Sequence, residues 1–412
     1  MIKDGNLTVG DNGHASLTIS NGGRVSDADA VVALGTGSSG DVLVTSRGKW
    51  EHSEGLRVGF QGQGSLTVSE AGQVTADTGS VAVVTVATGG VMVASGGRLE
   101  FQHDLTIGES GDGWMTIDAG GRVTSANASM GRNAGSLGQV NVTQSAAGPG
   151  PVWEAGTSLE IGVEGKAGLT VQAGQVHVAG FTSIAAAAGS LSALYVRNAR
   201  FSTDGDLNIG LAGNALVEMF HGAALDSGAT RLGLYAGGFG RLSVVGTNAQ
   251  WNLTGGLVAG TAGSGILTLN GASRLLQDGG YFTLAAEPGS AGHVELRDGF
   301  VLSSNATLFM ERGDAQMIVA AGSSAEFAAA QLGSTAYQTH AATATLGVLD
   351  ADSSFTAGYL TSGGHGTSLT QATHGGVVNV GRASFGAYGP ATPDPDVRHT
   401  AVCQWRVIAL LL

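Results

Sequence analysis

Cysteine, proline and charged residues are all scarce in this chain of 412 residues, and each scarcity excludes a class of protein. The single cysteine, Cys403, excludes a disulfide framework and a cysteine-based zinc site within the chain. With only 6 prolines and no strict Gly-X-Y period, the sequence does not encode a collagen-like triple helix. Charged residues make up 12% of the chain, about half the usual share, so solubility has to come from uncharged polar residues and glycine.

The charge that is present has a predominant sign, with 32 acidic against 19 basic residues and a net charge of −13. The basic residues are scattered singly, so we expect no nucleic-acid partner. Long apolar runs are also missing. Residues Met1–Asn6 lack the apolar stretch of an export signal, and the tail Ala401–Leu412, interrupted by Arg406, is too short to span a bilayer.

Glycine is abundant, with 70 residues, and apolar residues reach 42%, which is too many for a disordered linker. The dominant pattern is a four-residue phrase, here called the anchor, that reads apolar, any residue, apolar, glycine. The anchors are Leu7–Gly10, Leu56–Gly59, Leu105–Gly108, Leu159–Gly162, Leu207–Gly210 and Leu257–Gly260. Successive anchors are 48 to 54 residues apart, so the chain is an array of imperfect repeats of about 50 residues.

Two further phrases follow each anchor and have the two-residue period of a β-strand. The second phrase comes 10 residues after the anchor, and its middle residue is usually threonine, which suits the outward side of a strand. The second phrases are Leu17/Ile19, Leu66/Val68, Met115/Ile117, Leu169/Val171, Val217/Met219 and Leu267/Leu269. The third phrase comes 25 residues later in five of the six repeats, so each repeat contains two coils of about 24 residues.

These coils predict an all-β fold, a right-handed single-stranded parallel β-helix or solenoid, in which stacked coils bury ladders of apolar side chains. Regular coils are expected over residues 1–300 and degenerate coils over 301–389. An irregular or disordered tail is expected over 390–412. The longest repeat carries its extra residues around Gly148–Pro151, which predicts a surface loop between fixed strands. Trp50, Trp153 and Trp251 recur at equivalent positions; packing in the core is the main interpretation, and an aromatic ladder that binds sugars is the alternative.

Several phrases resemble a known family: Leu-Thr-Val-Gly at Leu7–Gly10, Gly-Ser-Leu-Thr-Val at Gly64–Val68, and Gly-Gly-Arg-Val at Gly22–Val25 and Gly120–Val123. They are similar to repeats of type V secretion autotransporter passengers and of some PEP-CTERM-associated bacterial surface proteins. The resemblance covers residues 5–300 well and 301–389 loosely. It implies a Gram-negative cell-surface or secreted β-helix that is adhesive or structural. It also implies a parent protein anchored in the outer membrane through a C-terminal β-barrel, which this chain lacks.

One short motif is a candidate cell-binding site: Arg312, Gly313 and Asp314 form the tripeptide that integrins read, in the less regular segment where a loop can present it. Four other motifs have a simpler structural interpretation. Asp204 with Asp206, and Asp350 with Asp352, could pair as carboxylates on a strand but are expected at turns. Leu225–Gly228 resembles a serine-protease nucleophile phrase without its leading glycine and is also placed at a turn, while His221 and His293 are expected at solvated corners. Gly111–Gly113 is a single calcium-repeat-like phrase that does not iterate.

The sequence therefore predicts a non-catalytic passenger domain, adhesin-like or a structural stalk, without a cofactor, metal or catalytic residue. Host-surface or matrix glycans or proteins are the expected partners. One alternative is a carbohydrate-active parallel β-helix, a lyase or glycosidase, which needs a cluster of acidic residues on one external groove. The other alternative is a non-functional truncated passenger fragment, because solenoids need caps at their open ends.

Overall fold

The computed structural model describes residues 5–333, 343–363, 367–385 and 401–404. All regular elements of this part are β-strands that pair in parallel, and they form a β-solenoid, as the sequence predicted. None of the described residues belongs to a helix long and apolar enough to cross a membrane. The chain divides into two compact units, Met1–Asp206 with Gly213–Ala215, and Leu207–Ala212 with Leu216–Leu412.

In the first unit each turn of the solenoid gives two strands to one sheet, called sheet A, and one strand to another, called sheet B. The strands of sheet A are β1 (Leu7–Val9), β3 (Arg24–Asp27), β4 (Ala30–Val32), β6 (Lys49–His52), β7 (Gly55–Val58), β9 (Gln73–Ala76), β10 (Thr78–Val81), β12 (Arg98–Phe101), β13 (Asp104–Ile107), β15 (Arg122–Met130), β17 (Val152–Ile161), β19 (Gln175–Val178), β20 (Phe181–Ile184) and β22 (Arg200–Thr203). Those of sheet B are β2 (His14–Ile19), β5 (Ser39–Val44), β8 (Gln63–Val68), β11 (Thr88–Val93), β14 (Asp112–Asp118), β16 (Leu137–Thr143), β18 (Lys166–Gln172) and β21 (Leu191–Arg197). In β15 and β17 the two strands of sheet A have merged into one, with a register shift at Ser125.

The second unit repeats this plan. Its sheet A strands are β23 (Leu207–Ile209), β25 (Ala224–Ser227), β26 (Thr230–Leu232), β28 (Gln250–Leu253), β29 (Leu257–Ala259), β31 (Arg274–Gln277), β32 (Phe282–Leu284), β34 (Val301–Ser304), β35 (Thr307–Met310), β37 (Ser324–Leu332), β39 (Ser354–Ser362) and β41 (Val377–Phe385). Its sheet B strands are β27 (Phe239–Val245), β30 (Ser264–Asn270), β33 (Ala291–Arg297), β36 (Asp314–Val319), β38 (Thr343–Leu349), β40 (Thr367–Thr373) and β42 (Ala401–Gln404), while β24 (Asn214–Met219) is divided between the units.

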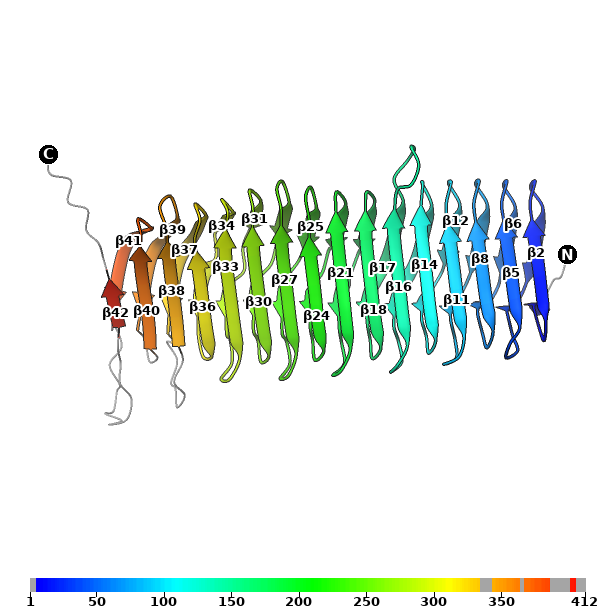
Figure 1. The fold of residues 1–412 in the computed structure, drawn as a ribbon, viewed down its shortest axis with the longest axis horizontal. Coiled ribbons are helices and arrows are strands. Elements are labelled where there is room, and N and C mark those ends of the chain that lie inside the picture. The colour runs from blue at the N-terminus through cyan, green and yellow to red at the C-terminus, as the bar shows by residue number, and fades with distance from the viewer. Residues whose placement is uncertain (1–4, 334–342, 364–366, 386–400, 405–412) are drawn as a thin grey trace. The chain divides into compact units, whose positions relative to one another are not determined.

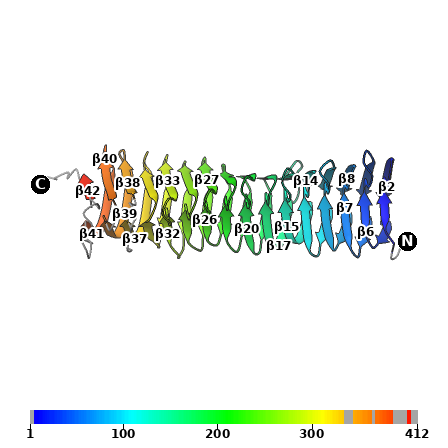
Figure 2. The ribbon, with the colours of Figure 1, turned by 90° about the horizontal axis from the view of Figure 1, so that it is seen from below.

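The strands of sheet B stack in chain order, and the register gives the length of a turn. Leu17 pairs with Val42 and Val42 pairs with Leu66, so successive turns take 25 and 24 residues. Figure 1 shows β2, β5, β8 and β11 side by side in this order, and Figure 2 shows the same stacking for sheet A strands such as β15 and β17. The predicted coil length is confirmed, and the right-handed sense stays a prediction.

Apolar ladders fill the interior of the first unit, as the phrases predicted. One ladder on sheet B is in register over eight turns and consists of Leu17, Val42, Leu66, Val91, Met115, Val140, Leu169 and Leu194. All of them except Leu17 are buried, and burial of each such side chain is worth roughly 1.5–3 kcal/mol. The threonines between the paired apolar residues, such as Thr67 and Thr116, lie on the outer side, as predicted.

The glycine of the anchor ends one strand and turns the chain toward sheet B. At Gly108 the backbone is left-handed, with φ of +71°. A Cβ atom there would also overlap the carbonyl oxygen of Leu137 on the next turn. Both the torsion and the close approach therefore require glycine, which explains why the anchor is the most regular phrase of the repeat.

The recurring tryptophans are core residues, and the sugar-ladder interpretation of them is wrong because Trp50, Trp153 and Trp251 have no exposed surface. Trp50 Nε1 donates to Asp27 Oδ2 over 2.8 Å, and Trp251 Nε1 donates to Ser227 Oγ over 3.0 Å. In both cases the acceptor comes from the preceding turn. The indole thus satisfies its one donor inside the solenoid while its rings pack in the core.

The inserted residues of the longest repeat lie in a surface loop, as predicted. Residues 145–150 are exposed between β16 and β17, and this loop extends beyond the neighbouring turns in Figure 1. Parallel pairing in register also continues past residue 300, from β34 to β37 and from β37 to β39. Within the tail that we expected to be irregular, Ala401–Gln404 differ from the expectation and pair with β40 as β42.

Candidate functional site

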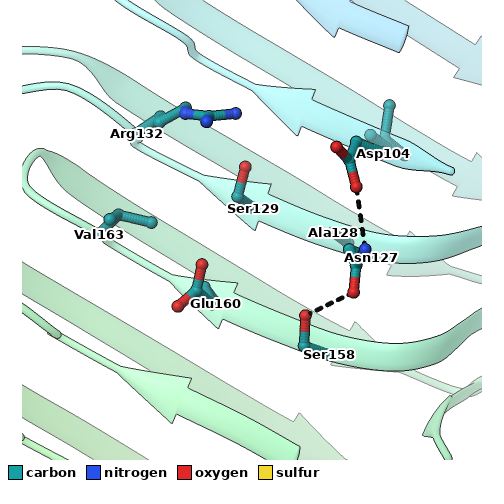
Figure 3. Close-up of a pocket in the computed structure, with 9 residues that line it drawn as sticks. Asp104, Asn127, Ala128, Ser129, Arg132, Ser158, Glu160 and Val163 are labelled. Carbon is teal, nitrogen blue, oxygen red and sulfur yellow. Dashed lines mark hydrogen bonds between the residues drawn. The ribbon is translucent and has the colours of Figure 1, made fainter. Parts of the chain in front are cut away.

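An open groove of about 270 Å³ lies on the outer side of sheet A in the first unit, across β13, β15 and β17. Side chains alternate along a strand, so Asp104 and Thr106 of β13 both point outward, and the residues paired with them continue both rows onto the next turns. Figure 3 shows lining residues on three successive strands, with Arg132 and Val163 in the turns that follow β15 and β17. The groove is lined by Asp104, Leu105, Asn127, Ala128, Ser129, Arg132, Ser158, Glu160 and Val163.

The first row of the groove is a hydrogen-bonded chain of Asp104, Asn127 and Ser158. Asn127 Nδ2 donates to Asp104 Oδ1 over 2.9 Å, and Ser158 Oγ donates to Asn127 Oδ1 over 3.0 Å. The three residues are in register on adjacent turns. Each side chain is therefore fixed by its neighbour, which leaves one oxygen of the Asp104 carboxylate for a ligand.

The second row consists of Thr106, Ser129 and Glu160. The hydroxyl groups of Thr106 and Ser129 are 3.1 Å apart, and Thr106 is only 2% exposed although it faces outward. Glu160 is partly buried, whereas Arg132, in the turn after β15, is exposed. Arg132 forms no ion pair with the residues that the structure describes. The groove therefore offers a ligand the cationic group of Arg132, the neutral hydroxyl group of Ser129 and the anionic group of Glu160.

This arrangement suits recognition by hydrogen bonds and is wide for a pair of catalytic carboxylates. Asp104 and Glu160 lie on strands two turns apart, which places their backbones roughly 10 Å apart or more at ~4.8 Å per turn. Glycosidases hold their two carboxyl groups about 5–9.5 Å apart, so a catalytic pair here would need both side chains to lean toward each other, at the wide end of that range. The residues offer donors and acceptors to hydroxyl or amide groups on fixed strands, as binding sites require.

Arg312 and Gly313 lie in the tight turn between β35 and β36, Asp314 follows directly on the strand, and the described structure does not show a projecting loop there. The backbone N–H groups of Arg312 and Gly313 both donate to the carbonyl oxygen of Ala285, over 2.9 and 3.1 Å. Asp314 begins β36, and its Oδ1 accepts from Thr343 Oγ1 over 2.7 Å. The cell-binding role of this tripeptide stays a prediction, but any receptor would have to read a turn that is hydrogen-bonded to its neighbours.

Glu311, the residue before this tripeptide, should make the stability of the fold depend on pH. Burial raises the pKa of Glu311 above its ordinary value of 4.5, and the nearby Arg312 offsets this in part. The folded state therefore binds the proton more tightly than the unfolded state does, and ionised Glu311 destabilises the fold above the raised pKa. We expect Glu311→Gln to raise the melting temperature at neutral pH. The gain should shrink as the pH falls through the raised pKa toward 4.5.

The exposed Glu326→Gln is the control and should show no such trend. A gain in melting temperature for Glu311→Gln that is the same at every pH would contradict the account.

The two aspartate pairs lie at turns, as predicted. Asp204 is exposed in the bend after β22, and Asp350 and Asp352 both have left-handed backbones, with φ of +75° and +65°. These torsions are typical of aspartate in turns.

The placement of Leu225–Gly228 at a turn is wrong for most of the phrase. Leu225 and Ser227 lie on β25, and Ser227 is buried, where its hydroxyl contacts Thr230 Oγ1 at 3.0 Å and accepts from Trp251. The turn begins only after Ser227, the last residue of β25. Its surroundings are those of a structural hydroxyl and not of a nucleophile.

Of the two histidines, His221 is exposed at a turn, as predicted, but the corner placement of His293 is wrong. His293 lies in the middle of β33, on its outer side, because it continues the two-residue alternation of that strand. Gly111–Gly113 leads into β14. Among the described residues, no group of three or more histidine, cysteine or acidic side chains is arranged to hold a metal ion.

The groove residues were not singled out from the sequence, although a signal existed. Thr106 and Glu160 are the variable positions of two anchors, Leu105–Gly108 and Leu159–Gly162. The coil between these anchors contributes Asn127 and Ser129, which follow no anchor and were therefore not placed in register. Alignment of half-repeats would have placed all four positions on one face.

No protein-family model matches the sequence, and no curated protein matches it. One solved structure is similar. It is the crystal structure of a hyper-glycosylated TibA fragment whose glycosylation is catalysed by TibC. The two share 13% identity with a TM-score of 0.35, and the alignment covers 93% of this chain and 99% of that chain.

Proposed function

We propose that this chain is a non-catalytic passenger-like domain, on the surface of a bacterial cell or secreted, that acts as an adhesin through the groove on sheet A. The groove between Arg132 and Glu160 carries the proposal. It presents charged and neutral hydrogen-bonding groups on three rigid turns, whereas the interior of the unit is filled with apolar ladders. Surface glycans or proteins of a host or matrix are the proposed ligands.

The test compares variants of the groove with a variant elsewhere on sheet A. Glu160→Gln removes the charge and keeps the size of the side chain, and Arg132→Gln removes the charge and shortens the side chain. Arg98→Gln makes the same change at an exposed arginine of β12 that is not in the groove. The full chain is screened against a panel of glycans and matrix proteins. We expect each groove variant to lose about tenfold or more in affinity, which is about 1.4 kcal/mol, and Arg98→Gln to bind like the wild type. Equal binding by all variants would contradict the groove, and binding of no panel member would favour the stalk.

The groove also favours one second candidate, a carbohydrate-active enzyme, because Asp104 and Glu160 bring two carboxylates to one external groove. A glycosidase would generate reducing ends from a polysaccharide, and a lyase would generate unsaturated uronates. We expect neither product from the wild-type chain. Release of either product that is lost in Glu160→Gln would establish the enzyme and contradict the non-catalytic proposal.

A further inference from the structure

Trp114 differs from the other tryptophans that the structure describes. Trp50, Trp153 and Trp251 have no exposed surface, whereas Trp114 is 45% exposed on the outer side of β14 in sheet B. The residue follows the apolar-polar alternation of the strand and occupies an outward position, where the repeat usually has a small or polar residue. A tryptophan combines a large apolar ring with one N–H donor, so an exposed indole offers a partner both a stacking face and a hydrogen bond.

The neighbouring strand is shaped to receive the indole ring. Trp114 pairs with Gly90 of β11, and a Cβ atom on Gly90 would overlap the ring carbons Cζ2 and Cε2. Gly90 is buried although it faces outward, because the indole covers it. One face of the ring therefore rests on the backbone of β11, and the exposed area of Trp114 belongs to the rest of the ring.

Most outward positions around this ring are polar, and Met92 of β11 and Leu137 of β16 are the apolar exceptions. Asp112 and Thr116 are the outward neighbours on β14, Thr88 is an outward residue of β11, and Gln139 is paired with Trp114 on β16. None of these is cationic, and the net charge of the chain is −13. An apolar ring with a rim of hydrogen-bonding groups fits a sugar that has an apolar C–H face and equatorial hydroxyl groups. The carboxylate of Asp112 disfavours acidic sugars.

We propose that Trp114, resting on Gly90, is a stacking platform for a neutral oligosaccharide of β-linked pyranose units. This inference rests on the proposed adhesive function in one respect, because it takes from that function the idea that the ligand is a glycan. The site itself is separate from the groove, since its residues belong to β11, β14 and β16 of sheet B. Hydroxyl groups of the sugar would bind Gln139, Asp112 and the threonines of the rim.

The burial of the other tryptophans makes Trp114 a specific reporter. In a Trp405→Phe background, which removes the one tryptophan outside the described residues, acrylamide should quench the fluorescence of Trp114 preferentially. We expect cellohexaose to protect Trp114 from quenching and to bind by calorimetry, and an oligogalacturonide of equal length to do neither. Trp114→Ala should weaken cellohexaose binding by tenfold or more.

Gly90→Ala is the matched variant, since Gly90 is not in the left-handed region and alanine suits its backbone. The added methyl group should tilt the ring off the sheet, so cellohexaose binding should be lost although the tryptophan remains. Undiminished binding by Trp114→Ala or Gly90→Ala overturns the platform. Failure of cellohexaose to protect Trp114 from quenching also overturns it. Protection that depends on protein concentration and not on sugar overturns it too, and would indicate that Trp114 lies in a contact between copies of this chain. The Arg132→Gln and Glu160→Gln results report on the groove independently, so failure of one site is distinguishable from failure of the other.

Discussion

Gly108→Ala should lower the free energy of unfolding by roughly 2–5 kcal/mol, among the largest losses for a single substitution in the first unit. A left-handed backbone costs an alanine about 1–2 kcal/mol, and here φ is +71°. Overlap of the new Cβ atom with the carbonyl oxygen of Leu137 adds a packing cost of about 1–3 kcal/mol. Neither cost can be relieved by a side-chain rotation, because the backbone fixes the position of the Cβ atom and the carbonyl oxygen is itself a backbone atom. Urea unfolding gives the total loss, and hydrogen exchange at β13 and β14 shows whether it is local.

Two other glycines of the same unit separate the two contributions. Gly96 has φ of +75° and open space where a Cβ atom would lie, so Gly96→Ala should cost only about 1–2 kcal/mol. Gly168, in β18, has open space and no left-handed backbone, so Gly168→Ala should be neutral or slightly stabilising. Equal losses for Gly108→Ala and Gly96→Ala would mean that the close approach to Leu137 contributes nothing.

Asp27→Ala should cost about 2–6 kcal/mol, because it removes the shared acceptor of two buried donors and each unpaired donor costs about 1–3 kcal/mol. Asp27 Oδ1 lies 2.5 Å from His52 Nδ1, and Asp27 Oδ2 accepts from Trp50 Nε1 over 2.8 Å. The side chains of Asp27 and His52 are completely buried, and the Trp50 and His52 rings are 4.4 Å apart, edge to face. His52 Nε2 already has no partner among the described residues, so the substitution would leave the whole imidazole unpaired in the core.

The corresponding corner of the second unit provides the comparison. Ser227→Ala removes the acceptor of Trp251 Nε1 and leaves no histidine unpaired, so it should cost only about 1–3 kcal/mol. Trp153 Nε1, the equivalent indole donor of another turn, has no protein partner among the described residues. Urea unfolding measures the loss of free energy of unfolding for Asp27→Ala, Asp27→Asn and Ser227→Ala. We expect the largest loss for Asp27→Ala and smaller losses for the other two variants. A loss for Asp27→Ala no greater than that for Ser227→Ala would contradict the buried-pair account.

The fold was predictable because its determinants are local and repeat along the chain. The two-residue period of pairs such as Leu66/Val68 fixes which side of each strand is buried, and the anchor glycine is required by its own backbone torsion. The second coil of each repeat was harder to recognise, because alanine often replaces glycine at the equivalent corner. Ala33 and Ala82 have left-handed backbones, with φ of +59° and +57°, a conformation that alanine rarely adopts.

The groove and the platform were less predictable because they depend on which residues of different turns come into register. Gly90 and Trp114 are 24 residues apart and Asn127 and Ser158 are 31 apart, the latter because of the inserted loop. Neither pair carries a motif, and each side chain alone is an ordinary outward residue. The functional surface of a solenoid is formed by residues that pair between turns. Sequence motifs consist of residues that are close together along the chain, so they do not reveal such a surface.

Distances between outward positions of sheet B test the solenoid most directly. Thr18, Thr67 and Thr170 are in register on the same outer row, with six steps of pairing from Thr18 to Thr170 and four from Thr67 to Thr170. Spin labels at Thr18→Cys with Thr170→Cys, and at Thr67→Cys with Thr170→Cys, are measured in a Cys403→Ser background by pulsed electron resonance. At ~4.8 Å per step the backbones should be about 29 and about 19 Å apart, so the two label distances should be sharp and differ by about 10 Å. Broad distributions, or a difference that does not follow the number of turns, would contradict the parallel stacking on which both binding sites depend.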